Sequence, residues 1–428
     1  MDTIFALSTP PGKAGVAIVR VSGPKAFDAA EKLAGGVPEP RYASLKKIRS
    51  LSGALIDEGL IIAFPKGMSF TGENVVEFQV HGSNSVVTLL QAELAKLDGF
   101  RHARNGEFTR RALENGRLDL TQVEGLADLI EAETTAQHAQ AMSSFLGRFS
   151  EKAEAWRAEF VQISALLAVM IDFSDEDVPS DVIPVVIPQL ANIRYEISAE
   201  LDGVSVAERI RDGFEVAIVG EPNVGKSTLL NYIARREASI ISDIPGTTRD
   251  VIEVRVDLRG LPITFLDTAG IRESSDPIEA MGVSRAIARA ERADLRIFLV
   301  NGGESFVVER KPGDIVVGSK RDLGSDRAFA ISGLSGEGVD ELLSEISDIL
   351  IDRVGLGGLA TRTRHYNALK SCRDAIDEAL RYLELGESSV DLAAEEVRSA
   401  VYALEELLGR VDVEEMLGKI FSSFCIGK

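Results

Sequence analysis

The first part of the chain alternates short apolar runs with polar and glycine-rich stretches, a pattern typical of a mixed α/β domain. Val75–Val80 shows this most clearly, because apolar and polar residues alternate there as on a strand with one buried face. Pro10-Pro11-Gly12 predicts a turn between two strands, and Asp57-Glu58-Gly59 predicts the turn of a hairpin within Ala54–Phe64. The other elements predicted before Arg117 are strands at Thr3–Leu7 and Val16–Val21 and helices at Pro24–Leu33 and Ser83–Leu97.

From Leu118 to about Arg211 the apolar residues recur at helical spacing and glycine is scarce. Pro179, Pro184 and Pro188 interrupt this stretch and predict that a new helix begins near Gln189. A second helical stretch covers about Thr363–Phe424. We expect the two stretches to form one discontinuous all-α domain, with a separate domain inserted between them. The predicted apolar stripes are Val123, Leu126, Leu129 and Ile130; Phe160, Ile163, Leu166, Leu167, Met170 and Ile171; and Leu369, Ala375, Leu380, Val397, Val401 and Leu404.

A phosphate-binding loop follows the apolar run Val216–Val219. There, Gly220-Glu221-Pro222-Asn223-Val224-Gly225-Lys226-Ser227 matches the pattern G-x-x-x-x-G-K-[ST]. The glycines let backbone N–H groups turn inward around a phosphate, Lys226 supplies a positive charge, and the Ser227 hydroxyl is a ligand for Mg²⁺. A glycine-rich turn that matches by chance is the alternative, and the motifs that follow argue against it.

Three further motifs come in the order found in GTP-hydrolysing domains. Asp243–Asp250 contains loop threonines, and Ile263–Gly270 is a buried-strand pattern that contains Asp267, an acid able to reach Mg²⁺. Asp322 follows another apolar run, and its carboxylate can accept hydrogen bonds from guanine N1–H and N2–H. Together the motifs resemble those of translation-factor-like GTPases, which implies a Ras-like domain with a doubly wound, mostly parallel sheet. The residues expected at GTP are Asn223, Val224, Gly225, Lys226, Ser227, Thr228, Ser242, Thr247, Thr248, Asp267, Thr268, Ala269, Gly270, Ser319, Lys320, Asp322, Ser332, Gly333 and Leu334.

Three positions depart from the GTPase pattern. Ser319 replaces the asparagine of Asn-Lys-x-Asp, so the amide that ties the base to the phosphate loop is missing and weaker GTP binding is expected. The usual Ser-Ala-[Lys/Leu] is Ser332-Gly333-Leu334. Ras-like enzymes orient the attacking water with a glutamine just past the acid-x-x-Gly motif. Ile271 stands there and neither donates nor accepts a hydrogen bond, so another group must orient the water.

Composition and charge narrow the function classes. The 428 residues favour two to three domains, with 45% hydrophobic and 27% charged residues as in an ordinary globular protein. The net charge of −20 excludes non-specific nucleic-acid binding, so an RNA contact must be local or shared with a partner. Two cysteines, Cys372 and Cys425, argue against a disulfide framework. Without a basic leader or a run long enough to span a bilayer, we expect a cytoplasmic protein without a membrane partner.

Several polar residues of the first domain remain open between two interpretations. Glu77 is either solvent-facing on its strand or a ligand contact, and His81 is either structural or catalytic. The densest positive cluster is either a solvated helix face or an anion or RNA contact. Its members are Arg101, Arg104, Arg110, Arg111 and Arg117.

The whole chain resembles the MnmE (TrmE) family of bacterial tRNA-modification GTPases. The motifs that carry this resemblance are Phe70-Thr71-Gly72-Glu73-Asn74, the phrase Arg104–Leu120, Gly246–Asp250 and the terminal Phe424-Cys425-Ile426-Gly427-Lys428. The resemblance implies four segments: a folate-binding-like and dimerising domain at 1–117, the first helical part at 118–211, the GTPase domain at 212–352, and the second helical part at 353–428.

The resemblance also implies ligands and partners. A tetrahydrofolate derivative, 5-formyl or 5,10-methylene, would be contacted by residues matching Arg20, Glu77, Arg117 and Lys428, with arginine at 117 where the family often has lysine. The family acts as a homodimer with the FAD protein MnmG (GidA), as a heterotetramer on tRNA. It installs an aminomethyl or carboxymethylaminomethyl group at carbon 5 of the wobble uridine.

For GTP hydrolysis, the resemblance implies K⁺ in place of an arginine finger and pairing of two GTPase domains. Asn223, Ser242, Ile244 and Thr247 match the K⁺ ligands, and Ser227 and Thr248 match the Mg²⁺ ligands. Asn223 is alternatively a loop-stabilising amide. Glu279 would orient the water through a bridging water, and Cys425 would assist one-carbon transfer or only hold the tail. The residues expected to be catalytic are Glu279, Lys226, Thr248, Asp267 and Cys425.

Two other function classes are open to test. A GTPase switch without modifying activity would need an appended RNA-binding domain, and none is evident after Thr363. A folate aminomethyltransferase with a merely structural GTPase unit is disfavoured by the intact Lys226, Ser227 and Asp267.

Overall fold

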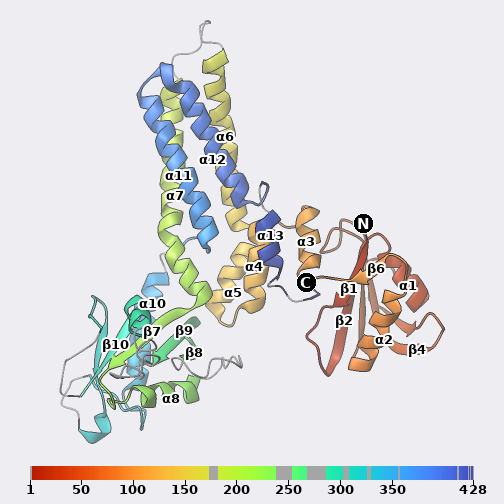
Figure 1. Cartoon of the computed structure of the whole chain (residues 1–428), viewed down its shortest axis with the longest axis horizontal. Helices are drawn as coiled ribbons and strands as arrows, with labels where there is room; N and C mark the ends of the chain where they lie inside the picture. Colours follow the sequence, from red (N-terminus) through yellow and green to blue (C-terminus); the bar gives the residue numbers. More distant parts are fainter. Residues whose placement is uncertain are drawn as a thin grey trace, which may run out of the picture. The chain divides into compact units, whose positions relative to one another are not determined.

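The computed structural model describes residues 2–172, 182–237, 253–267, 286–301, 308–324, 329–354, 357–411, 414–422, 424 and 426–427. The chain divides into two compact units (Figure 1). Unit 1 comprises Met1–Ala127 with Glu405–Lys428, and unit 2 comprises Asp128–Leu404. The four segments implied by the family resemblance stay a prediction. Among the described helices, none has the length and apolar character needed to pass through a bilayer.

Unit 1 is built on a six-stranded sheet in the order β3-β4-β5-β2-β1-β6. β1 and β6 pair in parallel, and the other neighbours are antiparallel. Val76, Phe78 and Val80 of β5 are buried beneath α1 and α2, whereas the alternate residues Glu77 and Gln79 face the opposite side. The elements are β1 Thr3–Leu7, β2 Ala14–Ser22, α1 Ala26–Ala34, β3 Ser44–Arg49, β4 Leu55–Phe64, β5 Val75–Gly82, α2 Asn84–Ala95, β6 Phe100–His102 and α3 Glu107–Glu114.

The hairpin predicted within Ala54–Phe64 is wrong, because β4 is one continuous strand and the turn lies at residues 50–54. Asp57 points to the next strand, where its carboxylate accepts a hydrogen bond from the His81 backbone N–H at 2.8 Å and lies 2.9 Å from His81 Nδ1. A Cβ on Gly59 would overlap the carbonyl oxygen of Gln79. Residues typical of a turn therefore serve here for close approach of two strands.

The C-terminal segment returns to unit 1. Leu417 and Phe421 of α13 (Glu414–Ser422) pack with Leu120 and Val123 at the start of α4 (Leu120–Glu131). Beyond α13, Ile426 forms a bridge with Asn105, and the Ser8 hydroxyl donates to the Gly427 carbonyl at 3.0 Å. The two ends of the chain thus belong to one folded unit.

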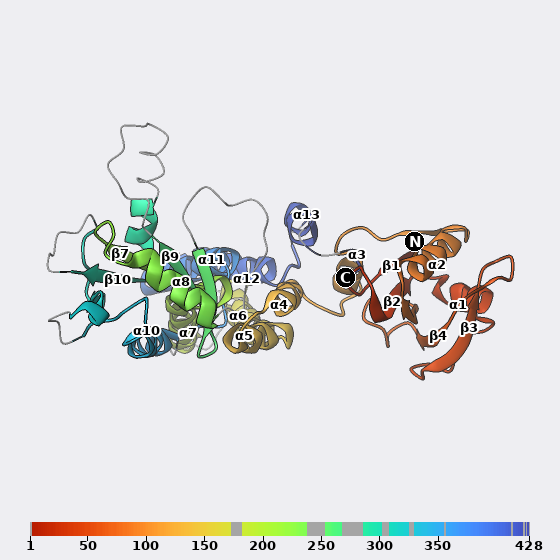
Figure 2. The ribbon, with the colours of Figure 1, turned by 90° about the horizontal axis from the view of Figure 1, so that it is seen from below.

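Long helices form the helical part of unit 2 and run side by side in Figure 1, and Figure 2 looks along them. Trp156 and Phe160 of α6 are buried in this bundle, and Trp156 Nε1 donates to Glu196 of α7 at 2.8 Å. The only described cysteine, Cys372, is buried, and burial raises the pKa of its thiol, as expected for a structural residue. The helices are α5 Thr135–Phe145, α6 Arg148–Asp172, α7 Val182–Asp212, α11 Thr363–Glu384 and α12 Val390–Leu407.

The predicted start of a helix near Gln189 is wrong, because α7 begins at Val182 and includes Pro184 and Pro188. Pro184 lies in the first turn of α7, where a backbone N–H would have no intrahelical acceptor, so its lack of an N–H breaks no helical hydrogen bond. Pro188 lies inside the helix between Val186 and Leu190, which are fully buried against the bundle. Apolar packing on both sides outweighs the backbone hydrogen bond that Pro188 lacks.

The second sheet has the order β11-β10-β7-β9-β8 and is parallel except for the antiparallel pair β8–β9. This confirms the mostly parallel sheet predicted around the phosphate loop. Every residue of β9 is buried, as its apolar run predicted. The elements are β7 Phe214–Gly220, α8 Lys226–Glu237, β8 Glu253–Leu258, β9 Leu261–Asp267, β10 Leu295–Val300, β11 Ile315–Gly318 and α10 Val339–Val354.

The turn between β8 and β9 is hydrogen-bonded to the helical part of unit 2. Ala136 N donates to Gly260 O at 3.1 Å, and Gln137 of α5 donates from Nε2 to Arg211 O, near the end of α7, at 2.8 Å. A capping box at Thr134 fixes the start of α5. The sheet and the helices are therefore joined by directional contacts.

Candidate functional sites

The phosphate loop lies between the end of β7 and the start of α8. Gly225 has φ +117° and Asn223 has φ +61°, both in the left-handed region. Glycine reaches this conformation without a steric cost, and asparagine tolerates it better than most residues. Such turns point successive backbone N–H groups inward, which suits an anion. The described loop thus has the backbone shape that the sequence predicted.

Lys226, Ser227 and Asp267 meet beside this loop. Lys226 is 5% exposed, and its Nζ donates to the Gly220 and Glu221 carbonyls at 2.7 and 2.9 Å. Register between β7 and β9 pairs Ile218 with Asp267, which brings the acid next to the loop. The Ser227 hydroxyl donates to Asp267 Oδ2 at 2.6 Å. A hydroxyl and a carboxylate so close together are suitable oxygen ligands for Mg²⁺.

A cavity of about 270 Å³ adjoins the same loop. Asp322 and Ser319 line it from the sheet side, and Gly333 approaches the backbone of Leu229 on α8. Ten residues expected at GTP line this cavity together: Asn223, Val224, Gly225, Thr228, Ser319, Lys320, Asp322, Ser332, Gly333 and Leu334. Sequence reasoning missed four apolar lining residues, Leu229, Leu299, Leu323 and Ile331, although all of them except Leu299 stand next to a residue expected at GTP.

Ser319 is the site residue whose environment departs most from the usual pattern. It is 3% exposed, and its Oγ has no hydrogen-bond partner among the described residues. A buried hydroxyl in this position needs a hydrogen-bond partner, and a bound base can supply one.

We expect Ser319→Asn to tighten GTP binding by about three- to tenfold, because a side-chain amide adds one hydrogen bond worth about 0.5–1.5 kcal/mol. Fluorescence titration with a labelled guanine nucleotide measures the change. The control is the exposed Ser335→Asn in the neighbouring loop, for which unchanged affinity is expected. Equal affinities of Ser319→Asn and the parent would show that position 319 does not limit base binding.

A second polar site lies on the sheet of unit 1. Arg20 and Glu77 occupy paired positions on β2 and β5, and Arg20 Nε donates to Glu77 Oε1 at 3.0 Å. The Arg20 guanidinium lies 5.8 Å from the ring centroids of both Phe70 and Phe108. Two residues that the family resemblance grouped are thus brought together beside two aromatic rings. Arg117 is exposed and packs against Gly72.

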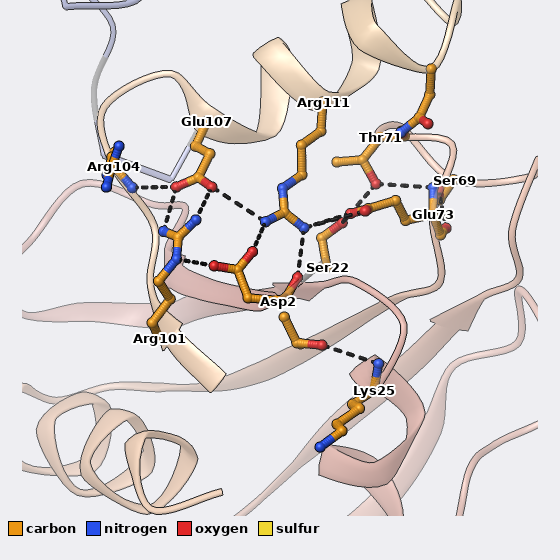
Figure 3. Close-up of polar contacts among 12 residues, drawn as sticks. Asp2, Ser22, Lys25, Ser69, Thr71, Glu73, Arg101, Arg104, Glu107 and Arg111 are labelled. Atoms are coloured by element: carbon orange, nitrogen blue, oxygen red, sulfur yellow. Dashed lines mark hydrogen bonds and ion pairs between the residues drawn. The ribbon is translucent and has the colours of Figure 1, made fainter. Parts of the chain in front are cut away.

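An ion-pair network underneath α3 was missed by sequence reasoning (Figure 3). Arg111 donates to Glu73 at 2.9 Å and to Asp2 at 2.8 Å, and Arg101 donates to Glu107 at 2.8 Å. Arg111 is 8% exposed, so its interpretation as part of a solvated helix face is wrong, and its interpretation as an anion or RNA contact stays a prediction. The contacts of Arg111 with Asp2 and Glu73 join residues far apart in the chain, and no local pattern predicts them.

Two carboxylates of the network, those of Asp2 and Glu107, have pKa values below their usual range. A hydrogen bond from Arg101 lowers the pKa of Asp2, although partial burial acts the other way. Burial alone would raise the pKa of Glu107, but hydrogen bonds from Arg101 and the Arg104 backbone outweigh it and the pKa lies below its usual value. At neutral pH these groups therefore form charged pairs.

The remaining predicted site residues lie outside the described residues. They are Ser242, Ile244, Thr247, Thr248, Thr268, Ala269, Gly270, Ile271, Glu279, Cys425 and Lys428. Their roles stay predictions.

Comparisons with known proteins cover the whole chain. A family model described as MnmE helical domain matches residues 120–425, and one described as GTP-binding protein TrmE N-terminus matches residues 3–117. The tRNA modification GTPases MnmE of Ruegeria pomeroyi and Dinoroseobacter shibae are 52% and 53% identical over 428 and 430 residues, covering 100% of each chain. Among solved structures, the G domain of the T. maritima FeoB iron transporter is 19% identical, covers 32% of this chain and 97% of its own, and has a TM-score of 0.22, too low for a comparison of folds. The chain therefore belongs to the MnmE family of tRNA modification GTPases.

Proposed function

We propose that this chain hydrolyses GTP as part of tRNA modification. The observation that carries the proposal is the grouping of Lys226, Ser227 and Asp267 at a phosphate loop. Lys226 would neutralise charge on the phosphate oxygens, and the backbone N–H groups of the loop would hold them in place. Asp322, on the wall of the adjoining cavity, would select guanine through its carboxylate.

Two metal ions fit this proposal. Mg²⁺ would be held by Ser227 and Thr248, with Asp267 accepting from the Ser227 hydroxyl or reaching the ion, and it would offset charge on the β- and γ-phosphates when bound. K⁺ would be held by Asn223, Ser242, Ile244 and Thr247. Asn223 is exposed and left-handed, which supports its part in this set because an exposed amide can turn toward the nucleotide. Glu279 would orient the attacking water in place of the absent glutamine.

A tetrahydrofolate derivative, 5-formyl or 5,10-methylene, fits the second site in unit 1. A carboxylate such as Glu77 accepts paired N–H groups from the amide-like edge of a pterin, and Arg20 holds that carboxylate in place. The nearby Phe70 ring, which is partly exposed, gives the site aromatic surface that suits a flat ligand. Arg117, Lys428 and Cys425 would complete the site, and the docking of Ile426 and Gly427 on unit 1 supports their participation.

The proposed reaction uses a homodimer formed through the N-terminal domain, together with the FAD protein MnmG and tRNA. Two GTPase domains would pair on binding GTP, and the hydrogen bonds between the β8–β9 turn and α5 offer a route from the nucleotide to the helices. The product would be an aminomethyl or carboxymethylaminomethyl group at carbon 5 of the wobble uridine. Identity near 50% to proteins named tRNA modification GTPases supports this proposal over the two other classes.

A gene-deletion strain tests the proposed function. We expect the modified wobble nucleoside to disappear from its tRNA, as measured by mass spectrometry of digested nucleosides, and to return with the parent gene but not with Lys226→Ala. Unchanged nucleosides would refute the role in modification. Full rescue by Lys226→Ala would favour a folate enzyme with a merely structural GTPase unit.

We also expect GTP turnover to be much faster in K⁺ than in Na⁺. Asn223→Ala should reduce the ratio of the two rates at least tenfold, because the variant lacks one K⁺ ligand. Phosphate release in matched chloride salts measures this. The control is Asn231→Ala, which replaces an exposed asparagine on α8 and should keep the full K⁺ response. The potassium proposal fails when Asn223→Ala hydrolyses GTP as fast as the parent in both salts.

A further inference from the structure

Unit 1 contains a cavity of about 570 Å³ that the proposed GTP and folate sites do not use. α3 and the loop before it form one wall, Asp2 and Glu73 lie at its base, and Leu417 and Phe421 of α13 form the opposite wall. Figure 3 shows the polar base of this cavity. All lining residues belong to one compact unit, so the cavity is a property of that unit alone.

The charged groups at the base of the cavity are paired with one another. Arg111 is held by Glu73 and Asp2, and Arg101 by Glu107 and Asp2. The side chains of Glu73, Glu107 and Arg111 are only 10–12% exposed. These groups are bound to one another, so an incoming ligand meets a fixed surface instead of free charges.

The rim of the cavity differs from its base because two of its arginines can contact a ligand. Arg104 is exposed, and no bond of its guanidinium is found within the part of the chain that the structure describes. Arg110 pairs with Glu114 one turn along α3, with side chains 48% and 49% exposed. An exposed pair of this kind contributes little stability, so the Arg110 guanidinium can change partners at small cost.

The charge balance argues for a polyanion over a small free anion. Four arginines and four carboxylates line the cavity, which leaves no net charge to trap a phosphate or sulfate ion. The two exposed guanidinium groups, those of Arg104 and Arg110, stand at the rim. Arginine forks match phosphate geometry, so two exposed arginines side by side suit the successive phosphates of a polyanion. In a chain with net charge −20, RNA must be bound at a local surface of this type.

We propose that Arg104 and Arg110 contact the phosphate backbone of the substrate tRNA at the rim of this cavity. The inference rests on the proposed function in tRNA modification, since it names where the RNA substrate meets unit 1. The buried ion pairs act as positioning groups, because they fix α3 and thereby the direction of both guanidinium groups.

Fluorescence anisotropy with a labelled anticodon stem-loop RNA tests the proposal on the full-length protein. Arg104→Gln and Arg110→Gln each remove one exposed charge and leave the buried network intact. We expect about three- to tenfold weaker binding for each, and a slope of log K against log salt that is smaller by about 0.7–0.9 per lost phosphate contact. Arg49→Gln is the matched control, because Arg49 is exposed on β3 at the opposite edge of the same sheet.

The outcomes separate this inference from the proposed function. Rim variants that bind RNA like the parent, or lose no more affinity than Arg49→Gln, overturn the inference. The inference is also overturned when the parent protein binds no stem-loop RNA. It is overturned as well when a rim variant binds RNA like the parent and loses only its binding to the FAD partner. The GTP hydrolysis rate, measured on the same preparations, reports the proposed function independently and should be unchanged in all three variants.

Discussion

Lys226→Ala is expected to slow GTP hydrolysis by about 10²- to 10³-fold at saturating nucleotide, the usual cost of removing one preorganised group that stabilises transition-state charge. Lys226 is almost fully buried, and its ammonium is held against the Gly220 and Glu221 carbonyls of the loop. Alanine has no group that can meet the phosphates from this position. Phosphate release in K⁺ buffer measures the rate, and nucleotide titration confirms saturation.

Lys311→Ala provides the matched control, because Lys311 is an exposed lysine of unit 2 whose Nζ donates only to the Glu291 carbonyl among the described contacts. Its hydrolysis rate should stay within about twofold of the parent. A Lys226→Ala variant with at least a third of the parental rate would contradict the role that we assign to the loop.

The second large effect concerns the stability of unit 1. Arg111→Ala should destabilise this unit by about 3–5 kcal/mol, because truncating one partner of a buried ion-pair network leaves uncompensated charge. Glu73, with its side chain 11% exposed, would lose its cationic partner, while Asp2 and Glu107 would keep Arg101. Hydrogen exchange of peptides from α3 measures the loss, because global unfolding of a chain with two units is not a single transition.

The neighbouring Arg110→Ala removes an arginine from the same helix, yet its exposed pair with Glu114 predicts a loss below about 0.5 kcal/mol. A comparable increase in exchange for both variants would show that the network does not hold α3. Arg111→Lys should recover part of the stability, since lysine keeps the charge but cannot bridge two carboxylates with a planar fork.

Local chemistry explains what could be predicted from the sequence. The phosphate loop combines glycines, a lysine and a hydroxyl within eight positions, and the structure gives it the expected strand, turn and helix. β9 was predictable because every one of its residues is buried on both faces of a mostly parallel sheet. Cavity residues as distant as Asn223 and Leu334 were grouped correctly because their motifs have a fixed order along such a sheet.

Features set by distant neighbours were not predictable. Gly59 looks like a turn residue, but the backbone of β5 lies against it. Pro188 looks like a helix breaker, but buried residues on either side keep α7 intact. Arg111 belongs to a cationic run in the sequence, whereas its partners Asp2 and Glu73 come from other parts of the chain. For Gly59 and Arg111 the deciding contact joins residues that no local window contains, and for Pro188 it is the packing of its neighbours in the bundle.

Unit 1 cannot fold completely until the residues on both sides of 128–404 have been synthesised, and this separation affects how the chain folds during translation. At translation speeds of about 5–20 residues per second, α13 begins to be made roughly 14–57 s after Ala127. Until then Leu120 and Val123 lack the apolar partners that α13 provides. The nascent chain therefore exposes this apolar surface to solvent for much longer than folding itself requires. A chain in this state is a suitable substrate for chaperones.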